Sequence, residues 1–281
     1  MIFVGLSVCF CVFLGHGGWN LHTDLSLESL AESLTGHLVG SKVHYYEVVS
    51  STMDEAKRLA DCGCAEGTVV LADNQVAGRG RFDRNWFSPQ GENLYFSVVL
   101  RPYPDQLPYI NMAAALAVST AIEKMIGIRP SIKWPNDVII DCLKVAGILL
   151  EVEVIGSDIR SVVVGIGLNV NLDPARFPEI VGTATSLSNV KGVRFNRTRV
   201  LTAVLESFDE LYEQVRNGDS LTESWSAEID TLGRLVEVHW GESVIEGIAM
   251  AVDEQGNLQL KLDNGSVKSV SAGEVTLRTL F

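Results

Sequence analysis

Apolar stretches separated by short polar turns divide the chain into predicted strands and helices. Segments rich in β-branched and aromatic residues predict strands at 42–49, 67–75, 93–100, 131–140, 144–155 and 158–169. Apolar residues at helical spacing predict helices at 25–38, from residue 52 onward, at 112–125 and at 196–215. Thr52 and Glu55 form a capping-box pattern, and Asn196 is a suitable N-cap for the last helix.

The connections between the strands of residues 131–169 are short. Asp141-Cys142-Leu143 makes a tight connection, and Gly156-Ser157 is a two-residue hairpin signal. Such turns join antiparallel neighbours, so we expect an antiparallel meander and not a doubly wound parallel sheet. From residue 235 to 277, five short strands separated by glycine-containing turns predict a small β-barrel. The expected fold class is therefore α+β with a mixed or antiparallel sheet.

An almost wholly apolar run occupies residues 2–14. It is too short to span a bilayer, which needs roughly 20 residues. Its length fits the apolar region of a signal peptide, but no Lys or Arg precedes Lys42 and no clear cleavage site follows. We favour an over-extended gene start. The expected division is an N-terminal extension (1–24), a large domain (25–231) and a small C-terminal domain (232–281).

Composition excludes some classes of function. The 281 residues are 47% apolar, and 35 acidic residues against 22 basic ones give a net charge of −13. That charge disfavours non-specific nucleic-acid binding. The five cysteines are sparse and odd in number, which indicates reduced thiols in the cytoplasm. The two Cys-X-Cys pairs are too closely spaced for usual zinc ligands, so we expect no metal site. Because the apolar run of residues 2–14 is too short to span a bilayer, we also expect no membrane partner.

A cluster of positive charge stands out at residues 78–86. Arg79, Arg81 and Arg84 fall within it, and Gly78 and Gly80 leave the backbone free for close approach to a ligand. Arginine presents a planar fork of donors that suits phosphate or carboxylate. A solvated basic turn is the alternative interpretation. The tryptophan and apolar strand that follow at once favour an anion-binding loop.

Three further segments carry candidate chemistry. Ser51 and Thr52 are fully explained by helix capping, although a helix N-terminus also makes a polar ligand site. The block 133–137 places Pro135 and two charges around a tryptophan in an apolar region, and Lys144 lies three residues before Gly147. Lys133 and Lys144 are either edge residues that reach water or site residues, and for Lys144 we favour a site. The glycines at 165 and 167 are either packing bulges or a place for a flat ligand.

With these residues assembled, the chain resembles the biotin–protein ligases over roughly residues 41–281. The resemblance rests on blocks in the family's order: Ser51-Thr52, Gln75, Ala77–Arg81, Arg84, Trp86, Lys133–Asp137, Lys144–Gly147 and Gly165–Asn169. It implies a catalytic domain related to class II aminoacyl-tRNA synthetases, followed by an SH3-like C-terminal domain. It also implies that biotin and ATP, with Mg²⁺, form biotinyl-5′-AMP, and that a lysine of a biotin carboxyl carrier protein domain then takes the biotin.

The resemblance assigns roles residue by residue. Arg81 and Lys144 would be catalytic, near the reacting carboxylate and α-phosphate. Biotin would be held by Ser51, Thr52, Met53, Gln75, Arg79, Gly80, Arg81, Lys144 and Gly147. The nucleotide would be bordered by Arg84, Trp86, Asn136, Asp137 and Asn169. The resemblance is compatible with a homodimer.

Two departures from the family pattern and two alternatives accompany these expectations. Met53 stands where the family usually has Asn, which leaves only its backbone for polar contact, and Asp83 stands where Gly is common. Residues 1–40 show no helix-turn-helix pattern, which argues against repression. The alternatives are a lipoate or octanoate ligase and a protein that binds biotin or its adenylate without transfer.

Overall fold

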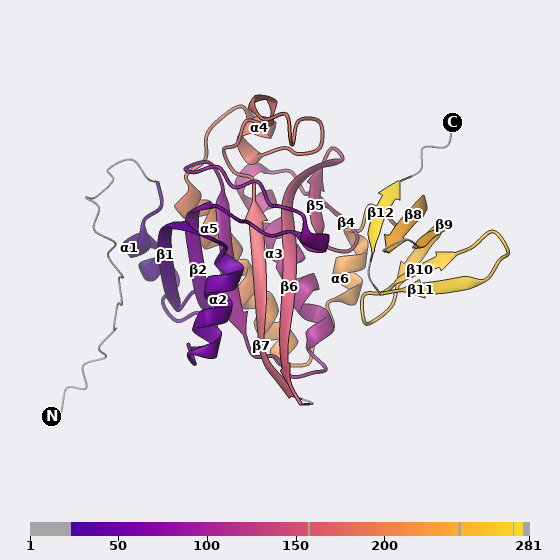
Figure 1. The fold of residues 1–281 in the computed structure, drawn as a ribbon, viewed down its shortest axis with the longest axis horizontal. Coiled ribbons are helices and arrows are strands. Elements are labelled where there is room, and N and C mark those ends of the chain that lie inside the picture. Colours follow the sequence, from indigo (N-terminus) through magenta and orange to yellow (C-terminus); the bar gives the residue numbers. More distant parts are fainter. Residues whose placement is uncertain (1–23, 157, 241–242, 272, 278–281) are drawn as a thin grey trace.

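The computed structural model describes residues 24–277 except 157, 241–242 and 272. The predicted N-terminal extension, apart from Asp24, and Ser157 of the predicted hairpin lie outside the described residues. Two sheets organise the chain (Figure 1). The larger one is built from β1 (Lys42–Val49), β2 (Thr68–Gln75), β3 (Leu94–Leu100), β4 (Ser131–Lys133), β5 (Asp137–Ile140), β6 (Leu143–Ile155) and β7 (Asp158–Leu168).

The larger sheet has seven strands in the order β1-β2-β3-β7-β6-β5-β4. It is mixed, because β1 and β2 are parallel while the other neighbours are antiparallel. The expected meander is confirmed for β4 to β7. Positive φ angles at Asp141 (51°) and Cys142 (63°) close the two-residue turn between β5 and β6.

Helices cover both faces of this sheet (Figure 1). One face packs against α3 (Leu107–Ile126) and α5 (Arg197–Arg216), and the other against α2 (Thr52–Asp61). The Ala-rich sequence lets α3 lie close to its neighbours, and α5 begins at Asn196, whose side chain accepts from the Arg199 N–H as predicted. The short helices are α1 (Leu27–Ser33), α4 (Leu187–Lys191) and α6 (Thr222–Ala227).

The alternation of side chains along β7 decides where a ligand can lie. Val162 and Val164 pack in the core with α3 and α5, whereas Val163 packs on the side of α2. Because successive strand residues point to opposite faces, Gly165 and Gly167 lie on the same face as Val163. That face therefore loses its side chains just beyond the N-terminus of α2.

Several predicted boundaries were wrong. The helix expected at 25–38 ends at Ser33, and Gly36 follows in a turn at φ +91°. The single strand expected at 131–140 is two strands, because Lys133 pairs with Asp137 across a turn that contains Pro135. Proline has no N–H to donate to a ladder, so the chain reverses there. The helix expected at 112–125 begins five residues earlier.

The smaller sheet is antiparallel and has the order β11-β10-β9-β8-β12. Its five strands are β8 (Leu235–Trp240), β9 (Ser243–Val252), β10 (Leu258–Lys261), β11 (Val267–Val270) and β12 (Glu274–Leu277). The five short strands expected in this part of the sequence are thus confirmed. Its first and last strands, β8 and β12, are hydrogen-bonded neighbours, and the start of β12 reaches the candidate site.

Candidate active site

A cavity of about 570 Å³ lies on the sheet face that the glycines leave open. Its floor is formed by Gly147 of β6 with Gly165 and Gly167 of β7. A Cβ at Gly167 would lie 2.3 Å from Cε2 of Trp86, and one at Gly147 would lie 2.8 Å from Cζ3 of the same ring. Side chains there would displace the tryptophan, so glycine is required at both positions for the Trp86 ring to lie against the sheet.

The residues expected at the biotin end meet at the N-terminus of α2. Ser51, not Thr52, is the N-cap: its backbone is extended and its hydroxyl accepts from the Met53 N–H at 3.3 Å. The predicted capping box is therefore wrong. The Thr52 N–H and hydroxyl both donate to Gln75 Oε1, at 2.8 and 3.1 Å. Glu55 contacts Arg58 and Tyr46 instead of the cap.

Met53 is almost fully buried and lines the cavity. Its Sδ would lie 2.4 Å from a Cβ at Gly165, so the thioether rests directly on the floor. Its backbone N–H is already bonded to Ser51. The first departure from the family pattern thus replaces an amide by an apolar wall. The side chain of Asp83, the second departure, is outside the described part of the chain.

The arginine loop, residues 78–86, closes on itself between β2 and β3. The Gly80 N–H donates to the Arg84 carbonyl at 2.7 Å, and the Trp86 N–H donates to the Gly78 carbonyl at 2.8 Å. A Cβ at Gly78 would lie 2.7 Å from that tryptophan's carbonyl oxygen, so the loop requires glycine there. Phe82 adopts a left-handed conformation (φ 54°) at its exposed tip.

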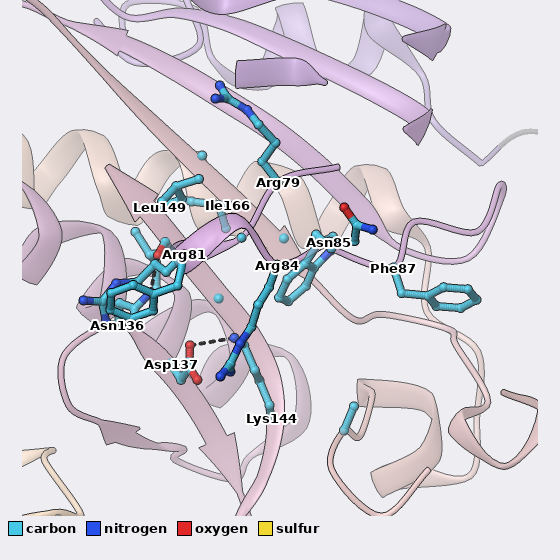
Figure 2. Close-up of a pocket in the computed structure, with 18 of the residues that line it drawn as sticks. Arg79, Arg81, Arg84, Asn85, Phe87, Asn136, Asp137, Lys144, Leu149 and Ile166 are labelled. Atoms are coloured by element: carbon cyan, nitrogen blue, oxygen red, sulfur yellow. Dashed lines mark hydrogen bonds and ion pairs between the residues drawn. The ribbon is translucent and has the colours of Figure 1, made fainter. Parts of the chain in front are cut away.

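The three arginines of the loop point in different directions (Figure 2). Arg79 turns toward α2 and β6, where it pairs with Asp54 at 2.8 Å and Glu151 at 3.0 Å. Arg81 donates to Asn136 Oδ1 and to the carbonyl of Gly273, both at 3.1 Å. Burial lowers the pKa of the Arg81 guanidinium from its ordinary value, although Asp137 and Glu274 oppose the shift.

Arg84 reaches the smaller sheet. Its Nη1 donates to Glu274 Oε1 of β12 at 2.7 Å, and its Nη2 forms a second bond to the same carboxylate. The hydrogen bonds from Arg84 lower the pKa of Glu274 below its ordinary value. The loop is therefore held from both sheets, with Arg79 on the larger one and Arg81 and Arg84 at the edge of the smaller one.

The block 133–137 and Lys144 face the loop across the cavity. Lys144 Nζ lies 2.7 Å from Asp137 Oδ1 and 5.1 Å from the centre of the Trp86 ring. Figure 2 shows Asp137 and Lys144 side by side, joined by a dashed line. Asn136 is fixed by a bond from its Nδ2 to the Ile148 carbonyl at 2.6 Å. Lys144 is thus brought to the arginine loop.

The charges that line the cavity are reversed relative to the whole chain. Five cations line it, against three carboxylates, in a protein whose net charge is −13. The cations are Arg79, Arg81, Arg84, Lys133 and Lys144, and the carboxylates are Asp137, Glu179 and Glu274. Such a site suits an anionic ligand.

Sequence reasoning missed an apolar wall at the far side of Lys144. Phe87, Leu172 and Ile180 line this wall, and Phe177 packs on Phe87 with ring centres 4.7 Å apart. The wall is tied to Lys144, whose N–H donates to the Thr183 carbonyl at 3.0 Å. Apolar residues inside a loop rich in Pro and Gly were the available signal.

Asn169 lines the cavity but is only 4% exposed. Its Oδ1 accepts from Asn93 Nδ2 at 3.1 Å, and its Nδ2 donates to the Thr185 carbonyl at 3.0 Å. The amide thus joins β7 to the loop that carries the apolar wall. All fourteen predicted site residues line the cavity. Two of them differ from expectation in what their side chains contact: Arg79 pairs with Asp54 and Glu151, and Asn169 bonds to Asn93 and Thr185.

Comparison with known proteins identifies the family of this chain. The profile of the Biotin/lipoate A/B protein ligase family matches residues 45–169, and that of the Biotin protein ligase C terminal domain matches residues 231–278. The Bifunctional ligase/repressor BirA of Bacillus subtilis is 38% identical over 88% of this chain and 78% of its own length. This chain belongs to the biotin–protein ligase family. It is a ligase, as the resemblance implied.

Further relatives extend the agreement to nearly full length. The Biotin--[acetyl-CoA-carboxylase] ligase of Mycobacterium tuberculosis is 34% identical over 91% of this chain and 96% of its own. The biotin protein ligase of Aquifex aeolicus, solved in complex with biotin and ATP, superposes with a TM-score of 0.71 at 32% identity. That alignment covers 84% of this chain and 98% of the Aquifex chain. The expected fold class, a synthetase-like α+β domain with a small C-terminal β-domain, is confirmed.

Proposed function

We propose that this protein couples biotin to ATP and then transfers biotin to a protein lysine. The first step gives biotinyl-5′-AMP and pyrophosphate, and the second releases AMP. The observation that carries the proposal is the meeting of Arg81, Lys144 and Asp137 over a flat glycine floor, in one cavity with a polar end and an apolar wall. The Aquifex relative is solved with both biotin and ATP.

In the first step, a carboxylate oxygen of biotin attacks the α-phosphorus of ATP. The bond from that phosphorus to the bridging oxygen breaks, and pyrophosphate leaves with the electron pair. Both reactants are anions, so catalysis consists chiefly of positioning and neutralisation. Lys144 and Arg81 supply the positive charge, and Asp137 holds the ammonium group of Lys144 at 2.7 Å.

The two ends of the cavity match the two reactants. At the polar end, Ser51, Thr52, Gln75 and the backbone around Arg79 and Gly80 would hold the biotin head group, with Met53 and the glycine floor beneath it. Gly147 leaves room for the Trp86 ring and for the ammonium group of Lys144, which would lie beside the reacting groups.

At the other end, Trp86 and the Phe87–Phe177 pair form a wall for the nucleotide base. Arg84 and Asn136 border the phosphates, and Asn169 holds the wall in place. Mg²⁺ fits this site in the way it fits most nucleotide sites, through a carboxylate together with the phosphates. Asp137 would hold it, and the ion would neutralise phosphate charge.

In the second step, the ε-amine of an acceptor lysine attacks the carbonyl carbon of the adenylate. An amide bond forms, the bond to the phosphate oxygen breaks, and AMP leaves. The acceptor is a lysine of a biotin carboxyl carrier domain. This assignment follows the printed name of the Mycobacterium relative, and its cellular place would be the cytoplasm, where ATP and reduced Cys62, Cys64 and Cys142 belong.

The domain division and the state of assembly belong to the same proposal. A catalytic unit of residues 25–231 and a C-terminal unit of 232–281 would act together, as a monomer or a homodimer. Within the described residues, no helix is both long and apolar enough to cross a membrane.

The decisive experiment measures pyrophosphate release from ATP with biotin, lipoate or octanoate as the acid. We expect release with biotin alone, and biotinylation of an apo carrier domain on blotting with avidin. Release with lipoate or octanoate but not with biotin would assign the alternative ligase. Binding of biotin without release of pyrophosphate would assign a binding protein.

A further inference from the structure

Trp134 links the catalytic block to the smaller sheet. Its side chain is 1% exposed, and its indole Nε1 donates to the carbonyl of Gly256 at 2.9 Å, across 122 positions of sequence. Gly256 lies in the turn between β9 and β10, at φ +78°. A buried indole N–H that finds a backbone acceptor fixes the plane of its ring.

The backbone around Trp134 is held from the same side. Its N–H donates to Thr231 Oγ1 at 3.2 Å, and the Ile132 N–H donates to the Glu228 carbonyl at 2.7 Å. Residues 228–231 lead directly into the smaller sheet. The outer half of the 131–137 hairpin is therefore fixed by the C-terminal part of the chain.

The inner half of the same hairpin faces the cavity. Two residues after Trp134, Asn136 accepts from Arg81, and one residue further on Asp137 pairs with Lys144. These contacts are 3.1 and 2.7 Å long, so a shift of about 1 Å in the hairpin would break them. Displacements of that size cost roughly 100-fold in rate when they misalign reacting groups.

We propose that Trp134 is a positioning residue for adenylate formation. Its hydrogen bond to the Gly256 carbonyl fixes the position of Asn136 and Asp137 relative to the smaller sheet. The carbonyl of Gly273, next to β12 of that sheet, also contacts Arg81. The smaller sheet thus positions both Arg81 and the residues that face it across the cavity, Asn136 and Asp137. This inference rests on the proposed function and adds to it Trp134, a residue of the cavity lining that acts through Asn136 and Asp137.

Trp225 offers a matched control. It is also 1% exposed, and its ring lies 3.6 Å from a Cβ built on the same Gly256. Its Nε1 is buried without a hydrogen-bond partner among the described residues, and its side chain does not line the cavity. Trp134→Phe removes a made hydrogen bond, whereas Trp225→Phe removes an equal volume from the same interface.

The test compares kcat, both KM values and the melting temperature for the two variants in the full chain. We expect Trp134→Phe to lower kcat for biotin-dependent pyrophosphate release at least 10-fold, with KM for biotin within twofold of wild type. We expect Trp225→Phe to keep kcat within twofold at a similar melting temperature. Retention of kcat in Trp134→Phe would overturn the proposal, as would equal losses in both variants.

Two further measurements keep the result interpretable. If Trp134→Phe does not fold, Thr231→Val removes the acceptor of the Trp134 N–H, and the same kcat loss is expected from it. Calorimetry of ATP binding, which needs no turnover, separates this inference from the proposed function. Wild type that binds ATP without releasing pyrophosphate rejects the function, whereas a wild type that releases pyrophosphate and a Trp134→Phe variant with the same kcat reject the positioning role alone.

Discussion

The protein uses cations in two different settings. Arg197, at the start of α5, is 1% exposed and is saturated by two carboxylates, Asp24 at 2.7 Å and Asp73 at 2.6 Å. Lys144, in the cavity, has one carboxylate partner and keeps a third of its side chain exposed. Arg81 donates to two neutral oxygens.

The difference separates structural cations from cations that are ready for a ligand. A guanidinium enclosed by two carboxylates has no charge to spare, and its removal leaves the buried carboxylate of Asp73 without a partner. A cation with one partner, or with neutral partners only, can still gain from an incoming anion. For Arg81, burial in the folded protein has already removed water from the guanidinium, as its lowered pKa indicates.

Removal of the core cation should have the largest effect. Arg197→Met leaves Asp73, 5% exposed, without its partner, so we expect a loss of about 3–5 kcal/mol in the free energy of unfolding. Chemical denaturation measures it. Arg199→Met, on the exposed side of the same helix, is the matched control and should change stability by less than about 0.5 kcal/mol. A loss below about 1 kcal/mol for Arg197→Met would remove the distinction between the two settings.

Removal of the cavity cation should affect rate and leave stability unchanged. Lys144→Met keeps the stem that packs beside Trp86 and removes the charge, so we expect pyrophosphate release to fall about 10²–10³-fold, equivalent to ~3–4 kcal/mol. The melting temperature should stay within a degree or two of wild type. Lys191→Met, exposed at the end of α4, serves as the control. Full activity in Lys144→Met would exclude the proposed catalytic role.

The residues of the site were predictable where local pattern carried the information. Glycines, arginines and Lys144 stand out by type and spacing, and short turns placed β5, β6 and β7 next to one another. Thr52 was predicted as the cap because Glu55 follows it by three residues, which is the capping-box spacing. Only the extended backbone at residue 51 (φ −151°) decides between Ser51 and Thr52.

Contacts between distant segments were not predictable. Arg197 looked like any helical arginine, because its partners lie 173 and 124 positions away. The contact of Trp134 with Gly256 and the packing of Phe177 on Phe87 depend on how whole elements meet. Periodicity states which face of an element is apolar, but not which other element covers that face.

The exposed pair between Arg84 and Glu274 fits neither setting, and breaking this pair should have the smallest effect. Arg84 is 65% exposed, so solvent screens the pair, and Glu274→Gln should cost about 0.2–1 kcal/mol at pH 7. Because Arg84 lowers the pKa of Glu274 in the folded state, the pair stabilises fully above the ordinary value of 4.5. That stabilisation is lost as the pH falls through the lowered pKa.

Thermal unfolding of wild type and Glu274→Gln between pH 7 and pH 3.5 tests this pair. The difference in melting temperature should be constant down to about pH 5 and should shrink below it, and 1 M salt should reduce it at pH 7. Glu254→Gln, exposed in the turn between β9 and β10, should show no such dependence. A difference that grows on acidification would mean that Glu274 is stabilised in its protonated form, and the ion pair with Arg84 would then not contribute to stability.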